Sequence, residues 1–218
     1  MMSIPLPMLK AVIVSLLYQA CFSDQHLINA VQKGTIDHIK HHVETLKKDV
    51  NHADQWKHHV IKHAAHRGDV DIGHYLIQQG ANPHVRTNEG RTTLHAAAHQ
   101  GRFEMVQFLL DHGVNIDTVD HRFGYTALMM AISELHHGHI QKEHEKVIRL
   151  LIDKGSDLFN IRGTRNGKNC LDIMEKKKLQ HPRLYKHMHA KAEEQKLKVV
   201  KEAETLLQEA NEVQQNEL

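Results

Sequence analysis

Apolar residues in this chain gather in short segments of helical length, separated by polar residues and glycine. Such segments lie at 72–77, 105–110 and 147–152. The same kind of turn follows each of them, namely Gly80-Ala81-Asn82, Gly113-Val114-Asn115 and Gly155-Ser156-Asp157. A glycine just after a helix commonly takes the left-handed conformation that ends it. The pattern therefore predicts a series of short helices that all end in the same way.

A second pattern shows that these helices belong to repeated units. Residues 92–101, Thr-Thr-Leu-His-Ala-Ala-Ala-His-Gln-Gly, align with residues 59–68 at an offset of 33 and with residues 25–34 at a further 34. Downstream, residues 126–132 align at an offset of 34 and residues 169–173 at 43. Periods of this length indicate stacked units, none of which can bury its apolar face alone.

The unit at 90–115 resembles the ankyrin-repeat family. It reads Gly-Arg-Thr-Thr-Leu-His-Ala-Ala-Ala-His-Gln-Gly and then Met-Val-Gln-Phe-Leu-Leu-Asp-His-Gly-Val-Asn, with Thr93 where the family has proline. The resemblance covers about residues 25–177 and implies helix-turn-helix units joined by hairpin fingers. We therefore expect an all-α fold, an ankyrin-repeat solenoid over residues 24–178. It would hold about four units and a half, with layers filled by Ile61, Leu94, Leu128 and Leu171.

The fourth unit departs from the pattern by an insertion. Seven positions separate Ala98 from Met105, whereas fifteen separate the equivalent residues Ile132 and Val147. The eight extra residues fall within 134–145 and are expected to lengthen the turn between the two helices. Insertions of this kind lie in loops, which can form a binding side of the stack or stay solvated.

The first 23 residues have the pattern of a secretory signal peptide. Lys10 precedes the apolar run 11–18, and Cys21 and Ser23 provide a small-x-small site for cleavage before Asp24. The run is too short to span a bilayer. The alternative is a retained helix that caps the first unit. The first interpretation predicts an exported or secreted protein, and the second a cytoplasmic one.

The sequence pattern of residues 183–214 predicts a long amphipathic helix. They lack Gly and Pro, and their apolar residues follow a three- and four-residue spacing. The helix would cap the stack of a monomer or pair with another chain as a coiled coil. Its final residues include five glutamates and no Lys or Arg after Lys201. This ending is similar to the C-terminal signals of effectors that intracellular bacteria inject into host cells. The alternative function is therefore that of a secreted effector, which would act on a host protein by the same surface.

Composition narrows the chemistry. The formal net charge is only +2, so nucleic-acid binding is not expected. Histidine is abundant, with 22 residues, and its protonation below the usual pKa of about 6.5 would make the surface strongly basic. The pairs His38/His42, His59/His63 and His95/His99 have the spacing of metal ligands on a helix, and His136, His137, His139 and His144 cluster in the insertion.

No metal, cofactor or catalytic residue is expected from these histidines. No Cys or HExxH arrangement accompanies them, and neither a nucleophile elbow nor a phosphate-binding loop is present. The resemblance gives His95 a different role, a hydrogen bond to the backbone of the neighbouring turn. His66 and His99 occupy equivalent positions and are expected to line one surface.

The remaining function is the binding of a protein partner by a non-catalytic scaffold. The resemblance implies that such stacks bind with their finger tips and their concave face. Alignment places Trp56, Glu89 and Phe123 in one column of finger tips. Aromatic and arginine side chains often dominate interfaces, although these rings could also fold back onto adjacent fingers. The candidate partner-binding residues are Trp56, Arg86, Asn88, Glu89, Arg91, Arg122, Phe123 and Tyr125.

Overall fold

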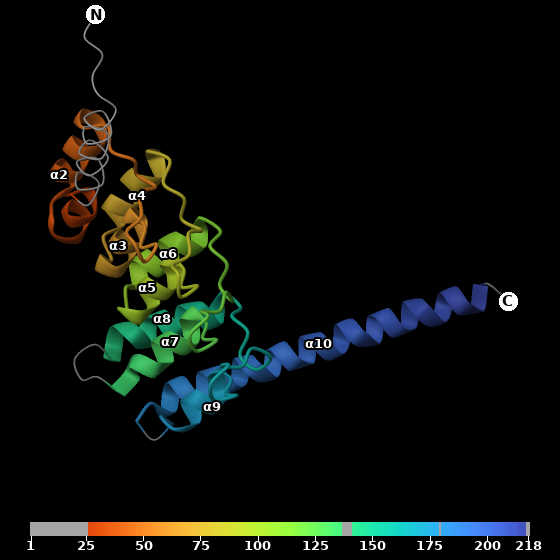
Figure 1. The fold of residues 1–218 in the computed structure, drawn as a ribbon. Coiled ribbons are helices and arrows are strands. Elements are labelled where there is room, and N and C mark those ends of the chain that lie inside the picture. The colour runs from red at the N-terminus through yellow and green to blue at the C-terminus, as the bar shows by residue number, and fades with distance from the viewer. Residues whose placement is uncertain (1–25, 137–140, 179, 217–218) are drawn as a thin grey trace, which may run out of the picture.

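The computed structural model describes residues 26–136, 141–178 and 180–216 of the chain (Figure 1). Over these residues the regular structure is entirely helical. Two isolated bridges, Ala53 with His59 and Arg86 with Thr92, close the bases of finger turns. The predicted all-α solenoid with a long C-terminal helix is confirmed.

The helices alternate between an inner and an outer row. Residues 26–33, α2 (Ile36–Lys40) and the π-helical segment η1 (His41–Thr45) form the first unit. The second contains α3 (Val60–Arg67) and α4 (Val70–Gln78), and the third α5 (Thr93–His99) and α6 (Phe103–Asp111). The fourth contains α7 (Ala127–Ser133), the 3-10 segment η2 (Glu134–His136) and α8 (Gln141–Asp153). Helices α9 (Cys170–Glu175) and α10 (Pro182–Asn216) follow.

The rows stack along a single direction (Figure 1). Helices α3, α5, α7 and α9 contact one another in sequence and form the inner row, while α4, α6, α8 and α10 form the outer row. The first part of α10 thus packs on α8 and α9 in the place that outer helices take in the preceding units.

Repeated local signals start and end these helices. Thr126 Oγ1 accepts a hydrogen bond from Met129 N (3.2 Å), and Asn169 Oδ1 accepts one from Asp172 N (2.9 Å) at the equivalent position. Such N-caps satisfy amide groups that have no partner inside the helix. At the other end, Gly80 and Gly155 both have φ of +91°, as their position after a helix predicted.

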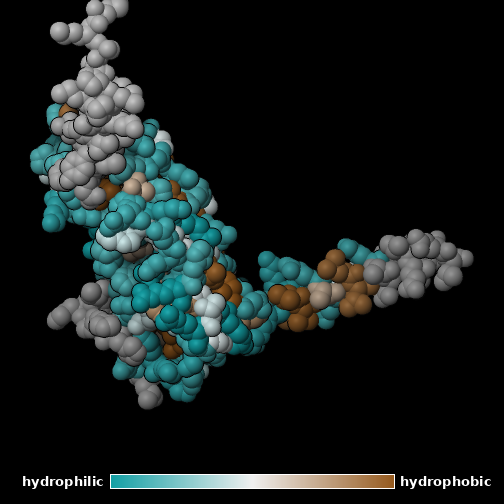
Figure 2. Space-filling model, viewed as in Figure 1, coloured by the Kyte–Doolittle hydropathy of each residue, from teal (hydrophilic) through white to brown (hydrophobic). Residues whose placement is uncertain are grey.

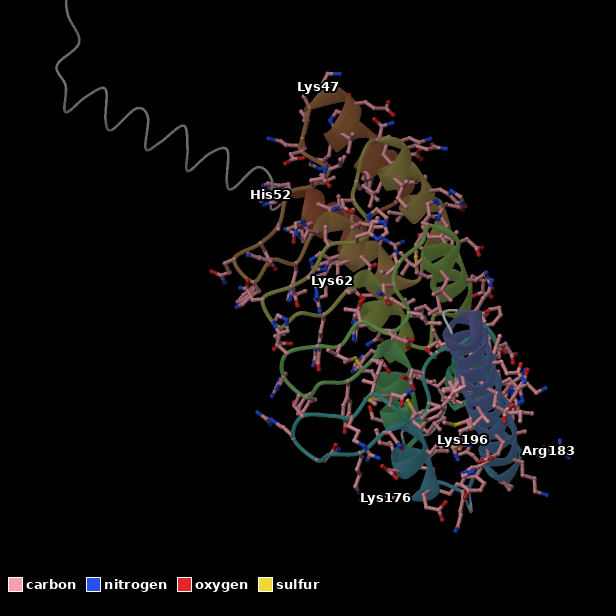
Figure 3. The ribbon with its side chains drawn as sticks, turned by 90° about the vertical axis from the view of Figure 1, so that its right-hand side faces the viewer. Lys47, His52, Lys62, Lys176, Arg183 and Lys196 are labelled. Atoms are coloured by element: carbon pink, nitrogen blue, oxygen red, sulfur yellow. The ribbon has the colours of Figure 1, made fainter. Side chains whose placement is uncertain are left out.

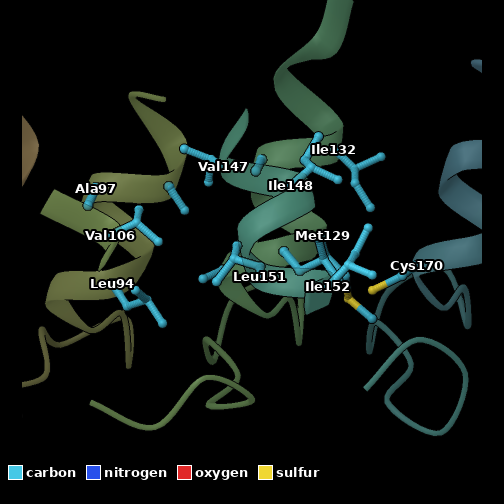
Figure 4. Packing of buried hydrophobic residues seen from close by; sticks show 14 of the residues in the cluster. Leu94, Ala97, Val106, Met129, Ile132, Val147, Ile148, Leu151, Ile152 and Cys170 are labelled. Carbon is cyan, nitrogen blue, oxygen red and sulfur yellow. The ribbon is translucent and has the colours of Figure 1, made fainter. Parts of the chain in front are cut away.

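Small and branched apolar residues fill the space between units (Figure 4). Ala97 is completely buried, while Leu94 and Leu128 are at most 1% exposed. Leu171, at the end of the series, is only half-buried. Because alanine lets neighbouring helices approach closely, burial of the large residues between them stabilises the stack without aromatic side chains.

The insertion extends a helix as well as a turn. Helix α8 contains 13 residues, whereas α6 contains nine. Because Val147 aligns with Met105, α8 begins about one turn earlier in its unit than α6 does. The additional turn is anchored by His144, whose Nε2 lies 2.9 Å from the carbonyl oxygen of His99. The insertion was expected to lengthen only the turn, but part of it forms this additional helical turn. Residues 137–140 of the insertion lie outside the described ranges.

Helix α10 divides into two parts of different character. Leu184, Met188 and Ala192 are at most 1% exposed, and Gln195 Nε2 donates to Ser156 O (2.8 Å). Beyond this bond the helix extends away from the stack, and hydrophobic residues gather on it (Figures 1 and 2). Leu197, Val199, Val200, Leu206 and Leu207 are 50–65% exposed. The first part caps the stack, which is one of the two predicted roles, whereas the described side chains from Lys196 to Glu209 are exposed.

The predicted signal peptide, residues 1–23, lies outside the residues that the structure describes. Within the described residues, no helix is both long enough and apolar enough to cross a membrane.

Candidate partner-binding groove

The finger tips form a row linked by backbone hydrogen bonds. The carbonyl oxygen of Trp56 accepts from Asn88 N (3.1 Å), that of Glu89 from His121 N (2.7 Å), and that of Phe123 from Thr164 N (2.7 Å). Each tip residue therefore makes the same contact with the following finger. The predicted column of Trp56, Glu89 and Phe123 is confirmed as a set of equivalent positions.

A groove of about 640 Å³ runs between these fingers and the inner helices. Its finger side is lined by Asp54, Trp56, His58, Asn88, Glu89 and Arg91, and its helix side by Lys62, His63, His66, His95, Ala96 and His99. Figure 3 shows Lys62 on the side of the inner helices that faces the finger loops. Of the eight candidate residues, the structure brings Trp56, Asn88, Glu89 and Arg91 to this groove.

Trp56 is the large apolar side chain most exposed in the groove. It is 57% exposed, and its ring centroid lies 6.0 Å from that of His58. Its backbone is nevertheless held, because Trp56 N donates to Asp54 Oδ1 (2.9 Å) while its carbonyl accepts from the next finger. Trp56 is thus an exposed aromatic ring on a fixed backbone.

Phe123 lies differently, although it occupies the same column. Its ring centroid is 5.0 Å from the guanidinium carbon of Arg122 and 5.0 Å from that of Arg165. The Tyr125 ring lies 5.7 Å away. Cation–π contacts of this kind stabilise the ring in place. Phe123 therefore folds back onto neighbouring groups. For Trp56 and Phe123, this arrangement was the expected alternative to binding a partner.

The charged tip residues partly pair with one another. Glu89 lies 3.3 Å from Arg91 Nη1 and 3.8 Å from Arg122 Nη1. Arg91 also reaches the buried carboxylate of Asp120, with Nε 3.4 Å from Oδ2. The contact between Glu89 and Arg91 lies at the surface and contributes little to stability, so both residues remain able to exchange this contact for a partner's.

Three other candidates serve the fingers themselves. Arg86 donates from Nε to Gly90 O (3.1 Å) and from Nη2 to Val119 O (2.8 Å). Asn88 Nδ2 donates to Gln55 O (3.2 Å), and the Tyr125 hydroxyl accepts from Asn166 Nδ2 (2.8 Å). Their side chains join one finger to the next, so their hydrogen bonds are already used within the stack.

Comparison with known proteins agrees with this geometry. The family model described as ankyrin repeats (3 copies) matches residues 17–120 and 61–162, which together are more than half of the chain. This chain belongs to the ankyrin-repeat family.

Three relatives of this ankyrin-repeat chain illustrate the range of proteins that carry similar segments. A Fowlpox virus protein named for its ankyrin repeats is 22% identical over 135 residues, 62% of this chain. The mouse protein phosphatase 1 regulatory subunit 12A is 27% identical over 142 residues, 61% of this chain. The palmitoyltransferase AKR1 of Lachancea kluyveri is 30% identical over 140 residues, 50% of this chain. The matches cover only 29, 14 and 18% of these relatives' own lengths.

Histidines on the inner ankyrin helices were not among the candidate residues. His63 aligns with Ala96 of the next unit, a position that faces the groove. His66 and His99, which alignment placed on one surface, both line the groove, as predicted. The repeat register was the signal that could have found His63, because His63, Ala96 and Met130 occupy equivalent positions and all line the groove.

Burial keeps His63 and His66 in the groove neutral near pH 7. Desolvation, with the nearby charge of Lys62, lowers the pKa of His63 to about 4. Burial also lowers the pKa of His66, with a smaller effect from His99. Lys62 itself is partly buried, and this lowers its pKa to about 8. At neutral pH the groove therefore presents the neutral imidazoles of His63 and His66 among the opposite charges of Lys62, Arg91, Asp54 and Glu89.

His95 has the structural role that the resemblance implied. Its ring is 1% exposed, and its Nε2 lies 2.9 Å from the carbonyl oxygen of Tyr125 in the next finger. Its Nδ1 accepts a hydrogen bond from Thr92 N (3.1 Å). His95 therefore ties the start of helix α5 to the neighbouring ankyrin finger.

The residues that could hold a metal ion differ from the helical histidine pairs. His59 contacts the backbone instead, since its Nδ1 lies 3.0 Å from the carbonyl oxygen of Asn51. Among the described residues, Asp54, His58 and His63 instead bring three ligand atoms within 4.8 Å of one another. Of the insertion's histidines, His137 and His139 lie outside the described ranges.

Proposed function

We propose that this chain is a non-catalytic binding module that holds a protein partner in the groove, with Trp56 as the central anchor. The supporting observation is the exposed Trp56 ring, 57% accessible on a backbone fixed from both sides, at the edge of a groove of about 640 Å³. A rigid aromatic residue that becomes buried on binding contributes strongly to affinity and loses little conformational entropy.

The chemistry of the groove suits a polar segment that carries one large apolar side chain. Glu89 and Arg91 can exchange their mutual contact, 3.3 Å long, for hydrogen bonds to a partner. The partner's apolar side chain would cover Trp56. One relative is by its name a regulatory subunit of a phosphatase, which agrees with a binding role for an ankyrin-repeat segment.

Two matched substitutions test this proposal. Trp56→Ala removes the anchor, and Leu207→Ala removes another exposed apolar side chain, on the projecting part of α10. We expect Trp56→Ala to abolish partner capture, while Leu207→Ala keeps it. Both should unfold within about 0.5 kcal/mol of the unmodified chain, because neither side chain is buried. Loss of capture with Leu207→Ala alone would place the partner on α10 and overturn the proposal.

Crosslinking locates the partner directly. A photoreactive residue at position 55, beside Trp56 on an exposed finger tip, should crosslink the captured protein. The same residue at position 111, exposed on the outer row, should not. Equal crosslinking at the two positions would show that the partner does not occupy the groove.

We also propose that residues 1–23 direct export, which would make the chain a secreted effector or another exported scaffold. The support is the short apolar run after Lys10 and the small residues before Asp24. Sequencing the N-terminus of the mature protein tests this directly. A chain that begins at Asp24 supports export, and one that retains residues 1–23 contradicts it.

A further inference from the structure

A finger and a helix converge at one end of the groove. Asp54 and His58 belong to the finger before α3, and His63 lies on α3 itself. Asp54 Oδ2 is 3.2 Å from His58 Nδ1, and the three ligand atoms all lie within 4.8 Å of one another. The rings of His58 and His63 meet edge to face, with centroids 5.9 Å apart.

We propose that Asp54, His58 and His63 form a binding site for a divalent transition metal ion, and that Zn²⁺ is the ion it fits. Two imidazole nitrogens and one carboxylate oxygen are a ligand set that Zn²⁺ accepts, with a fourth position left for water or another ligand. The open position would face the groove.

The spacing of the ligands agrees with a tetrahedral ion. Metal–ligand bonds of about 2.0–2.1 Å at tetrahedral angles separate the ligand atoms by roughly 3.3 Å. The pair formed by Asp54 and His58 already has this separation, at 3.2 Å. His63 has to close a gap of at most about 1.5 Å, which side-chain rotation on a fixed helix can provide.

The backbone holds two of the ligands in place before any ion binds. Asp54 Oδ1 accepts hydrogen bonds from Trp56 N (2.9 Å) and His58 N (2.8 Å). These bonds leave Oδ2 directed toward the imidazole of His58. The carboxylate therefore needs no large rearrangement to become a ligand.

His63 supplies an independent observation. Its Nε2 is buried and has no hydrogen-bond partner among the described residues, which is unusual for a buried polar atom. Its Nδ1 lies 3.0 Å from the side-chain amide of Gln32. When Nε2 binds a metal, Nδ1 carries the proton, and a rotated Gln32 amide would accept it through Oε1. Metal binding would thus satisfy the unpaired nitrogen and retain a partner for the other one.

The triad is not repeated in the next unit of the stack. At the equivalent positions of the next unit, the repeat register places Thr87, Arg91 and Ala96. None of these can replace the carboxylate or the imidazoles as a ligand. The three residues are therefore not part of the framework that all units share.

Charges around the site are close to balanced. Asp54 and Glu89 oppose Lys62 and Arg91, and Arg91 is itself paired with Glu89 and with Asp120. The charge of Lys62 acts on His63 and would repel a metal ion at this site, so substitution of Lys62 gives a separate test of the proposal.

Calorimetric titration of the untagged chain with ZnCl₂ at pH 7.5 tests the site. We expect one tight site per chain. His63→Ala and His58→Ala should each weaken it by at least roughly 100-fold, because even groups that only orient ligands cost 10–100-fold when removed. His84→Ala is the matched control, because His84 is exposed on another finger and outside the triad. Equal affinity of His63→Ala and the unmodified chain would overturn the proposal.

Two further measurements separate ligand loss from misfolding. Each variant should keep the unmodified helical circular dichroism without metal, since neither imidazole belongs to the buried core. Co²⁺ should give the intense visible absorption of a tetrahedral site, and His63→Ala should lose it. Lys62→Gln keeps all three ligands and removes the repelling charge, so it should bind zinc more tightly. Unchanged affinity in Lys62→Gln, or octahedral Co²⁺ spectra, would place the ion elsewhere.

Discussion

The stack should lose stability in mild acid, because His95 must stay neutral to fit its site. A backbone amide can only donate, so the 3.1 Å contact from Thr92 N requires an unprotonated Nδ1. The proton of the neutral ring therefore sits on Nε2, which donates to the carbonyl oxygen of Tyr125 (2.9 Å). A second proton, on Nδ1, would remove the acceptor and place a charge in a buried site.

The magnitude follows from proton linkage. Burial lowers the pKa of His95 to about 4 in the folded chain, despite the hydrogen bond to Tyr125. In the unfolded chain its pKa is about 6.5. Below pH 6.5 the unfolded chain binds a proton that the folded chain does not, so stability falls as the pH falls toward 4. Between pH 7 and pH 5 this one residue should lower the free energy of unfolding by about 2 kcal/mol.

Urea unfolding at pH 7 and pH 5 measures the effect. His95→Gln keeps an acceptor and a donor on one side chain but does not titrate. The variant should be less stable than the unmodified chain at pH 7. Its free energy of unfolding should, however, decrease by about 2 kcal/mol less than that of the unmodified chain between pH 7 and pH 5. The other histidines titrate in both proteins, so the difference isolates His95. His84→Gln, at an exposed position, should leave the pH dependence unchanged.

An equal loss in His95→Gln and the unmodified chain would refute this reasoning. It would mean that His95 accepts a proton in the folded state, and therefore that the hydrogen bond from Thr92 N does not restrain its tautomer.

Three further substitutions or truncations test the packing. Leu94→Ala should cost about 3 kcal/mol in urea unfolding, because the side chain is 1% exposed between two layers; a cost below about 1 kcal/mol would show that the layers collapse onto the gap. Phe123→Ala should cost about 1–2 kcal/mol through the loss of its contacts with Arg122 and Arg165, and a value near zero would show that the ring is not held there. Removing residues 197–218 should change the unfolding free energy by less than about 0.5 kcal/mol, because the side chains described there are exposed; a larger loss would reveal contacts between this segment and the stack.

The equivalence of positions along the stack could be predicted from the residues alone. Gly80 and Gly155 end helices wherever the helix must stop, and Thr126 and Asn169 begin them, because these signals act within a few residues of the chain. The column of Trp56, Glu89 and Phe123 followed from the same register. The hydrogen bond of His95 to the next finger came from the family resemblance.

What these residues contact depended on the spatial arrangement of the units. Nothing local distinguishes Trp56 from Phe123, since both are aromatic residues at a finger tip; Phe123 is held because Arg165, from the following finger, reaches it. Similarly, α10 is buried as far as Gln195 and exposed beyond it because the stack ends there.

The sequence by itself thus determined the all-α ankyrin stack, its register and its finger column, because short-range periodicity and capping residues encode them. Only the tertiary structure decided the convergence of Asp54, His58 and His63. The three come from a finger turn and a helix, and their meeting depends on the Asp54 hydrogen bonds that fold the finger over α3. Helical spacing pointed instead to the pair His59 and His63, but the His59 ring contacts the carbonyl oxygen of Asn51.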